Sequence, residues 1–210
     1  SRFLPWLEND PCFFELGFWI LRRAVSDARA MLALCPDFVL NVNITVGQLQ
    51  HRDFLPKTLE ILRQEGFPPG HLCLELTERC KELDIDVLCR AIEAFRREGV
   101  RLALDDLGTG SASFGLLLRL PIQEIKLDKS FLDQASILPC QRSLIKGIVD
   151  IANDLGIDVL CEGIETEMQA VFLKQANCAF AQGYYYGRPV SFDEFSHRWL
   201  NRYEQDILLS

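Results

Sequence analysis

The sequence predicts an α/β fold, and within that class a TIM-type (β/α)8 barrel of which about six strand–helix units are present. Short apolar, β-branched runs alternate with longer segments whose apolar residues recur at helical spacing. Such alternation indicates a parallel sheet, either open or closed. Polar residues gather where the apolar runs end. An open sheet would spread them over about 25 Å, whereas a barrel places them around one centre, so we favour the barrel.

The first half of the chain alternates between helix and strand. Residues 15–33 carry apolar side chains on one helical face and end before a proline–aspartate pair. Residues 38–44 (FVLNVNI) are short and β-branched, which predicts a strand. Helical spacing returns in residues 53–65, which stop at a glycine, and residues 72–76 (LCLEL) predict the second strand. Residues 84–98 predict another helix that ends at a glycine.

The second half continues this alternation. Residues 100–105 (VRLALD) and 122–128 (IQEIKLD) predict strands, and a short helix over residues 111–119 separates them. Residues 140–155 are helical up to a glycine, and residues 157–161 (IDVLC) predict the next strand. The remaining elements are a helix, a strand and a helix over residues 166–176, 179–183 and 192–204. No linker interrupts the pattern, so residues 1–210 are interpreted as one domain.

Composition narrows the function classes. The chain has 22 basic and 30 acidic residues and a formal net charge of −8, which does not suit sequence-independent binding to duplex DNA. No apolar run reaches the roughly 18 residues of a membrane helix, so we expect no membrane contact by this segment. The 8 cysteines form no C-x-x-C pair and are interpreted as reduced, buried thiols of a cytosolic domain. The 3 histidines form no zinc-binding pair, so any metal would have oxygen ligands.

Polar side chains accompany each expected strand. They are Asn41 and Asn43, Glu75 and Glu78, Asp105 and Asp106, Lys126 and Asp128, Glu162 and Glu165, and Gln182. Because the carboxyl ends of parallel strands form the active-site face of a barrel, we expect these groups to lie together. Clustered carboxylates suit Mg²⁺ or Mn²⁺. Two such ions about 3.5–4 Å apart are the usual device for phosphodiester hydrolysis. Lys126 would orient the attacking water.

Each of these signals also has a structural explanation when it is taken alone. Asp105 and Asp106 before Gly-Thr-Gly are typical of a turn. Glu162 is typical of an acidic residue near a helix start, and Lys126 with a nearby aspartate is typical of a surface ion pair. Their joint placement on successive strand ends is what favours a functional site.

The same motifs resemble a known family. The matching stretches are FLPWLE, NVNIT, ELTER, LALDDLGTGSASFGLLLRLPIQEIKLDKSFL, CEGIETEMQAVFLKQANC and AQGYYYGRPVSFDEF. In order and spacing they resemble the EAL domain, and the resemblance covers nearly the whole chain. It implies a barrel of the EAL kind and a phosphodiesterase that hydrolyses cyclic di-GMP to linear pGpG with two ions of Mg²⁺ or Mn²⁺.

The resemblance also implies roles for individual residues. Asn43, Glu75 and Asp105 would bind the first metal, and Asp106 would face the second metal and a bridging water. Lys126 would contact the nucleophilic water, so that it carries catalysis together with Asp106 and Glu162. Asp128 would hold a metal-bound water, and Glu162 would be a further metal ligand. Gln182 would contact metal-bound water and substrate, and Arg188 would contact substrate. Glu78 and Glu165 would support the loop after Asp106.

The chain departs from the family pattern in two places. The Glu-Ala-Leu motif that names the family is absent, and its expected position lies upstream of Ser1. Since a barrel of this type takes about 250 residues, we expect one that is incomplete at its N-terminus. Leu107 and Ser111 stand where the family has aromatic residues. Two interpretations therefore stay open: an active phosphodiesterase, and a catalytically inactive domain that acts as a cyclic di-GMP receptor or protein-interaction module.

The resemblance carries expectations about partners as well. It implies a homodimer in which the loop after Asp106 couples dimerisation to metal binding. It also implies a sensor or GGDEF domain in the same natural protein. We expect cytoplasmic exposure because the dinucleotide is cytoplasmic, with membrane anchoring of the full-length protein left open.

Overall fold

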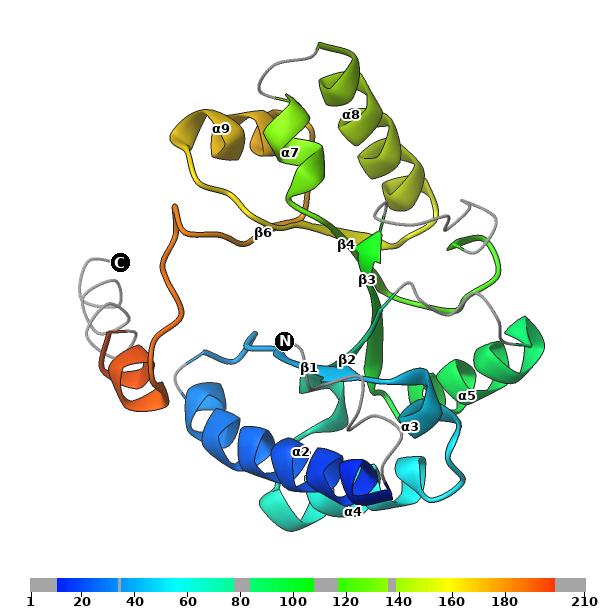
Figure 1. Cartoon of the computed structure of the whole chain (residues 1–210). Helices are drawn as coiled ribbons and strands as arrows, with labels where there is room; N and C mark the ends of the chain where they lie inside the picture. The colour runs from blue at the N-terminus through cyan, green and yellow to red at the C-terminus, as the bar shows by residue number, and fades with distance from the viewer. Residues whose placement is uncertain (1–10, 34, 78–83, 108–116, 136–138, 199–210) are drawn as a thin grey trace.

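The computed structural model describes residues 11–33, 35–77, 84–107, 117–135 and 139–198. Within these ranges, the strands form one parallel sheet whose spatial order follows the sequence. The strands are β1 (Leu40–Ile44), β2 (Leu72–Thr77), β3 (Arg101–Leu107), β4 (Glu124–Leu127), β5 (Asp158–Cys161) and β6 (Phe180–Ala181). Figure 1 shows the strands curving around a common centre with the helices on the outside. The predicted α/β barrel wall is therefore confirmed.

The helices together cover the outer face of the sheet (Figure 1). They are α2 (Pro11–Leu32), α3 (Val46–Gln50), α4 (Phe54–Glu65), α5 (Ile85–Arg97), α7 (Ser130–Ala135), α8 (Pro139–Asp154) and α9 (Glu167–Gln175), with a 3-10 turn, η1, at Pro69–His71. Helix α2 precedes the first strand, and the helices from α3 to α9 lie in the connections between strands. Residues 192–198 are also helical. Gly66 ends α4 with a φ of 65°, as the glycine after residues 53–65 predicts. None of the helices in the described ranges is both long and apolar enough to cross a membrane.

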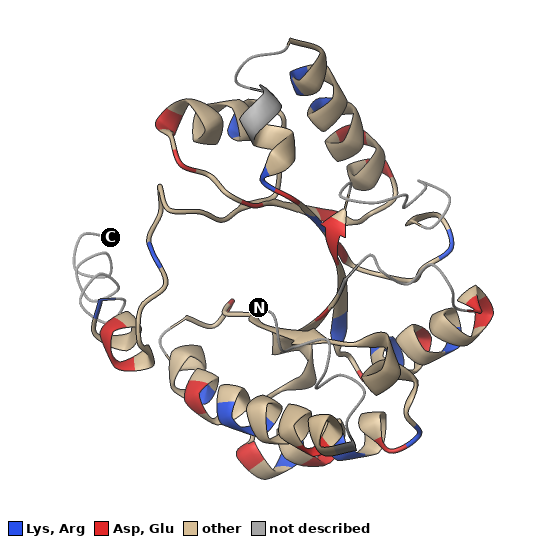
Figure 2. Cartoon of the chain, viewed as in Figure 1, with Lys and Arg blue, Asp and Glu red and all other residues tan. Residues whose placement is uncertain are grey.

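The two faces of the sheet differ in chemistry. Alternate residues of the strands point outward and pack with the helices; in β3 these are Leu102 and Leu104, each at most 1% exposed. The intervening residues of β3 point inward, toward the centre of the wall. Figure 2 shows acidic residues on β3 at this inner wall, whereas the outer helices carry acidic and basic residues together. The apolar core therefore lies between sheet and helices, and the polar groups face the centre.

Two short helices do not follow from the sequence pattern. Helix α3 spans only 5 residues and is held by a capping box between Thr45 and Gln48. Helix α7 spans 6 residues directly after β4. Neither is long enough to show helical periodicity. The helix expected over residues 111–119 lies mostly outside the described residues.

The cysteines correct one expectation. None of the seven that the structure describes is in a disulfide bond, and Cys73 and Cys161 are buried as predicted. Cys12 and Cys140 are exposed, so the prediction of buried thiols is wrong for these two. Both lie in the first turn of a helix, Cys12 in α2 and Cys140 in α8. Cys80 lies outside the described residues.

Candidate active site

Lys126 is the centre of the candidate site, on the inner face of β4. Its Nζ lies 3.0 Å from Oε2 of Glu75, 3.3 Å from Oδ1 of Asp105 and 2.7 Å from Oε1 of Glu162. Lys126 is 5% exposed and Glu75 is 4% exposed. The carboxylates come from β2, from β3 and from the residue after β5. The structure thus brings together four of the residues that the sequence singles out.

The register of the parallel strands explains this convergence. Asn43 in β1 pairs with Glu75 in β2, and Thr77 at the end of β2 pairs with Asp105. Because side chains alternate along a strand, Asn43, Glu75 and Asp105 all project from the inner face. The side chain of Asn41, two residues before Asn43, accordingly reaches Glu75 in a hydrogen bond. Asn41 belongs to this network, and the N-x-N spacing of the strand is the sequence signal that places it there.

A β-bulge interrupts the pairing of β3 with β4 at the two aspartates. Leu104 pairs with Ile125, and the next pairing joins Leu107 to Leu127. Two residues of β3 therefore lie opposite a single residue of β4. The second of them, Asp106, has a φ of 58°, in the left-handed region that aspartate adopts more readily than most residues. The bulge places two adjacent carboxylates at the rim of the site.

The electrostatics of the buried pair depend on burial and on neighbouring charges. Burial raises the pKa of Glu75, and Lys126 offsets only part of that effect. Burial alone would lower the pKa of Lys126, but its hydrogen bond to Glu162 and the charges of Glu75 and Asp105 outweigh burial and raise the pKa. Lys126 therefore stays protonated across the physiological pH range.

Asp106 lies within the field of the same cluster. Burial raises the pKa of Asp106, and the charges of Asp105, Asp128 and Glu162 raise it further. Asp128 has the opposite behaviour, because its hydrogen bond from Ser130 lowers its pKa. Oδ1 of Asp128 accepts the backbone N–H of Ser130 at 2.9 Å, so this carboxylate caps the start of α7.

The donor set fits divalent cations in its chemistry. The site holds more carboxylates than ammonium groups, and all its ligand atoms are hard oxygens of the kind that Mg²⁺ and Mn²⁺ prefer. Among the described residues, however, no three acidic, cysteine or histidine side chains surround a common point as metal ligands. Lys126 Nζ holds the position toward which three carboxylates turn. Each of these carboxylates contacts Lys126 through one oxygen, and its other oxygen can accept a cation.

Gln182 and Arg188 lie at a second part of the face, after β6. Both line a cavity of about 760 Å³ together with Leu160, Phe180, Ala181, Gly183, Tyr186, Gly187, Val190, Phe195 and Arg198. The guanidinium carbon of Arg188 lies 4.3 Å from the centre of the Tyr184 ring, a cation–π contact. The backbone of Gln182 donates to the carbonyl of Cys161 at 2.9 Å, which ties this segment to β5. Neither residue contacts Lys126 in a recorded ion pair or hydrogen bond.

Two further predicted residues do not join the Lys126 cluster. Glu165 is exposed beyond β5, and its backbone N–H donates to the side chain of Gln169 at 2.9 Å. Glu78 lies outside the described residues, as does the loop after Leu107 that it is expected to support.

A second polar cluster lies on the inner face, one layer below the first. Arg101 Nη2 lies 3.0 Å from Oδ2 of Asp158 and 3.7 Å from Oε2 of Glu124. Burial raises the pKa of Glu124, which is 4% exposed. Sequence reasoning did not single out this cluster. Glu124 stands two residues before Lys126 in the expected strand, and that spacing is the signal that places both on one face.

Comparison with known proteins connects this geometry to a family. The chain matches the family model of the EAL domain over residues 1–189. The cyclic di-GMP phosphodiesterase NbdA of Pseudomonas aeruginosa is 33% identical over 191 residues, which covers 90% of this chain and 24% of NbdA. The bifunctional diguanylate cyclase/cyclic di-GMP phosphodiesterase MucR of the same bacterium is 30% identical over 195 residues, 92% of this chain and 28% of MucR. The chain spans about a quarter to a third of the length of the curated relatives it matches.

Two of the solved structures that resemble this chain are complexes with cyclic di-GMP. The MucR phosphodiesterase in complex with cyclic di-GMP matches with a TM-score of 0.84 and 30% identity, over 92% of this chain and 79% of that one. BlrP1 of Klebsiella pneumoniae, solved as a manganese and cyclic di-GMP complex, matches with a TM-score of 0.76 and 27% identity, over 84% of this chain and 45% of that one. These likenesses confirm a TIM-type barrel. Since the family model spans most of the sequence, this chain belongs to the EAL domain family.

Proposed function

We propose that this chain hydrolyses cyclic di-GMP to linear pGpG with Mg²⁺ or Mn²⁺ bound in its acidic site. The observation that carries the proposal is the contact of the Lys126 ammonium with Glu75, Asp105 and Glu162, with Asp106 adjacent on the bulge. Hydrolysis of a phosphodiester needs a positioned water and stabilised negative charge on the phosphoryl oxygens. The lysine can position the water by a hydrogen bond, and divalent ions held by the carboxylates can stabilise the negative charge.

Each residue of the cluster would contribute in a defined way. Asn43, Glu75 and Asp105 would hold the first ion through side-chain oxygens, and Glu162 would be a further metal ligand. Asp106 would face the second ion, and Asp128 would hold a metal-bound water. When bound, the ions supply an activated water and charge stabilisation. Lys126 would donate a hydrogen bond that orients this water, since its raised pKa keeps it protonated and makes it a poor general base.

Gln182 and Arg188 would bind substrate beside this centre. The cavity they line, about 760 Å³, has the size of a small-molecule site. Arg188, on its lining, carries positive charge that complements an anionic dinucleotide. We assign the metal-bound water to Gln182 and substrate phosphate to Arg188.

Turnover with and without metal tests the proposal directly. Purified protein incubated with cyclic di-GMP and Mn²⁺ or Mg²⁺ should produce pGpG, measured by ion-pair chromatography, and EDTA should stop the reaction. Asp105→Ala should abolish turnover and weaken Mn²⁺ binding measured by calorimetry, whereas Asp150→Ala, on the outer helix α8, should do neither. Absence of pGpG from a protein whose Mn²⁺ site is saturated would overturn the proposal.

The second candidate function is a receptor that binds cyclic di-GMP without cleaving it. One observation favours it: Leu107 and Ser111 stand where the family has aromatic residues, in the loop that the resemblance connects to dimerisation and metal binding. The same experiment separates the two functions, because a receptor would bind the dinucleotide in calorimetry and release no pGpG at saturating Mn²⁺.

We further propose a homodimer, a sensor or GGDEF domain elsewhere in the natural protein, and cytoplasmic exposure of this domain. MucR, a bifunctional diguanylate cyclase/cyclic di-GMP phosphodiesterase, supports the partner domain. Light scattering on the purified protein measures the dimer directly, and a monomer at all concentrations would contradict it.

A further inference from the structure

We propose that Cys161 and Cys178 are a reversible redox site, whose intrachain disulfide stiffens the end of β5 and lowers turnover. The two Sγ atoms lie 3.6 Å apart in the reduced chain. A disulfide bond is about 2.05 Å long, so the sulfurs need to approach by roughly 1.5 Å. Neither cysteine belongs to the proposed catalytic machinery, and the pairing goes beyond the proposed function.

The surroundings hold both thiols in place. Cys161 is the last residue of β5 and is 1% exposed. Cys178 lies between α9 and β6 and is half-buried. Its Sγ lies 3.3 Å from the carbonyl oxygens of Val159 and Phe180, so the thiol faces the backbone of β5 and β6. The backbone N–H of Cys178 donates to the carbonyl of Leu173 at 3.0 Å, which anchors the segment to the end of α9.

Because Cys178 is more exposed than Cys161, we expect Cys178 to react first with an oxidant. Cys178, the more accessible thiol, attacks one oxygen of hydrogen peroxide, forms a sulfenic acid and releases one water. Cys161 then attacks the sulfenic sulfur, forms the S–S bond and releases the second water. In sum two thiols and one peroxide give one disulfide and two waters, and the sulfurs lose the two electrons that peroxide gains. A dithiol such as dithiothreitol reverses the bond by exchange.

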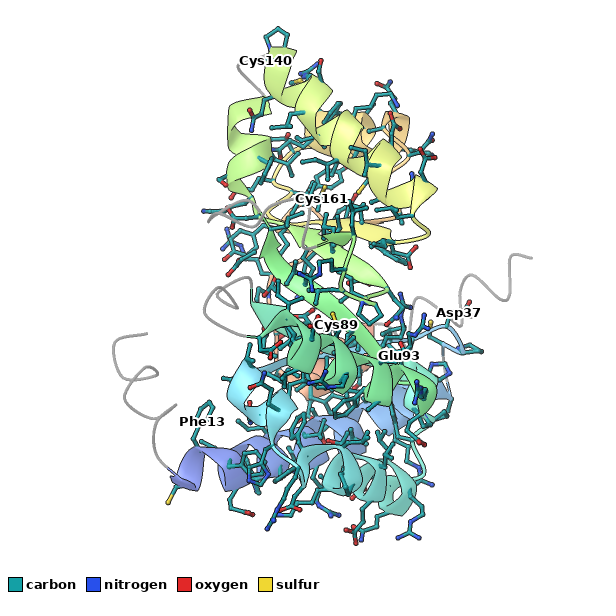
Figure 3. All side chains as sticks on the ribbon, turned by 90° about the vertical axis from the view of Figure 1, so that its right-hand side faces the viewer. Phe13, Asp37, Cys89, Glu93, Cys140 and Cys161 are labelled. Atoms are coloured by element: carbon teal, nitrogen blue, oxygen red, sulfur yellow. The ribbon has the colours of Figure 1, made fainter. Side chains whose placement is uncertain are left out.

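Other cysteines are placed differently. Figure 3 shows Cys140 at the outer tip of α8 and Cys89 on α5, each well separated from Cys161. Cys73 is fully buried in β2 and out of reach of an oxidant in solution. An exposed thiol that is far from Cys161 provides the natural control.

The bond would act on the candidate active site through the backbone. Glu162, which contacts Lys126 at 2.7 Å, is the residue after Cys161. The carbonyl of Cys161 also accepts the backbone N–H of Gln182 at 2.9 Å. A disulfide to Cys178 would therefore displace or fix the end of β5, which Glu162 follows and to which Gln182, the residue after β6, is hydrogen-bonded. Displacements of about 1 Å at reacting groups are enough to slow catalysis strongly.

Peptide mapping tests the site independently of activity. Protein treated with hydrogen peroxide and alkylated should yield one cross-linked peptide pair containing Cys161 and Cys178, lighter by two hydrogen atoms, and dithiothreitol should remove it. The bond closes a loop of 17 residues, so the oxidised chain should melt roughly 6–12 °C higher than the reduced chain. Cys178→Ser should abolish the cross-link and the shift, and Cys140→Ser should keep both.

Two results would overturn the proposal. If Cys161 and Cys178 both remain alkylatable after treatment, or if either joins another cysteine instead, the site does not exist. If the bond forms and an active protein turns over equally fast in both states, the link to the active site is wrong; we expect a loss of at least about threefold in the oxidised form and no loss in Cys178→Ser. This second readout rests on the proposed function. A protein inactive in both states would contradict that function, while the peptide map would still decide the disulfide.

Discussion

At the scale of single residues, the balance between Lys126 and the carboxylates around it affects both the stability of the fold and the proposed reaction. Lys126 is one ammonium that contacts three carboxylates, and Asp106 adds a further acid whose pKa is raised by burial and by its neighbours. A buried charge is costly unless it is paired, so removing Lys126 would leave several carboxylates uncompensated. The lysine therefore matters both to the apo fold and to the proposed reaction.

Lys126→Ala is expected to lower kcat by roughly 10²–10⁴-fold, the usual effect of losing a group that positions a proton-transfer partner. The loss should appear in kcat more than in KM, since Lys126 would contact the water and not the dinucleotide. Steady-state rates of pGpG formation measure the effect. Lys146→Ala, which removes an exposed lysine paired with Asp150 on α8, should retain the wild-type rate. A Lys126→Ala protein at full rate would refute the role.

Glu124 predicts a pH-dependent stability. Burial raises the pKa of Glu124 in the folded chain, and Arg101 offsets part of it. A carboxyl with a raised folded-state pKa stabilises the fold fully below its unfolded pKa, and that contribution disappears as the pH rises through the folded pKa. Glu124→Gln should therefore melt higher than wild type at about pH 8, by about 2–4 °C for each kcal/mol gained, and the difference should vanish near pH 4.

Melting curves of wild type and Glu124→Gln across this pH range measure the difference. Glu98→Gln, at an exposed helix end, should show no pH-dependent gain. A Glu124→Gln protein that is less stable than wild type at the alkaline end would show that the ion pair with Arg101 outweighs the cost of burial.

At the scale of elements, close backbone approaches fix the segments that carry the site. A Cβ at Gly183 would overlap the backbone of Ile164, the residue that follows the β5 turn. This contact is supported by hydrogen bonds, since Ile164 N–H donates to the carbonyl of Gln182 at 3.0 Å. The glycine after Gln182 therefore lets two loops of the candidate site pack directly against each other.

Gly183→Ala should destabilise the chain by about 1–3 kcal/mol, because one of the two loops has to move away. The thermal midpoint should fall by several degrees, and the affinity for cyclic di-GMP should fall with it. Gly147→Ala is the matched control, since nothing lies within 4 Å of a Cβ there and the position is within α8. It should be neutral or slightly stabilising. An unchanged Gly183→Ala midpoint would mean that the two loops adjust at no cost.

The periodicity of apolar residues predicted the long helices and the strands, but it did not predict the short helix α3 or the bulge in β3. Alternation in residues 100–105 and helical spacing in residues 140–155 each extend far enough to identify an element. Helix α3 depends on one capping interaction, and the bulge at Asp105 and Asp106 depends on pairing with a strand that is distant in the sequence. No single-segment pattern encodes that pairing. By contrast, the grouping of Lys126 with Glu75, Asp105 and Glu162 was expected from their places at strand ends, and only the individual ion-pair contacts needed the structure.

At the scale of the whole molecule, the parallel wall concentrates negative charge at its centre. The chain has a net charge of −8, and part of this excess lies on the inner face, around Lys126 and Glu124. Mutual repulsion among these carboxylates opposes folding in the absence of cations. Divalent ions that bind the native state would relieve it, so stability and proposed activity depend on the same groups.

Mn²⁺ should therefore raise the melting temperature of the chain. At one hundred times its dissociation constant an ion adds about 2.7 kcal/mol to the stability, or roughly 5–10 °C in a chain of this size. Scanning fluorimetry with increasing Mn²⁺, followed by EDTA, measures the shift and its reversal. Asp105→Asn should reduce the shift, while Asp150→Asn on α8 should leave it intact. No shift for wild type at millimolar Mn²⁺ would argue against an ion in the acidic centre.

The bulge in β3 has a consequence for how this sequence tolerates change in length. Loss of one residue from a strand ordinarily reverses the faces of everything that follows, which is why indels there are disruptive. Here two residues, Asp105 and Asp106, separate Leu104 from Leu107, and both leucines face the helices. In β4 only Lys126 separates their pairing partners Ile125 and Leu127. Deletion of Asp106 would restore plain alternation and leave both leucines facing outward. We expect this shortened chain to keep its circular dichroism spectrum and to melt cooperatively while losing turnover. That result would show that Asp106 is needed for the reaction and that β3 folds without it.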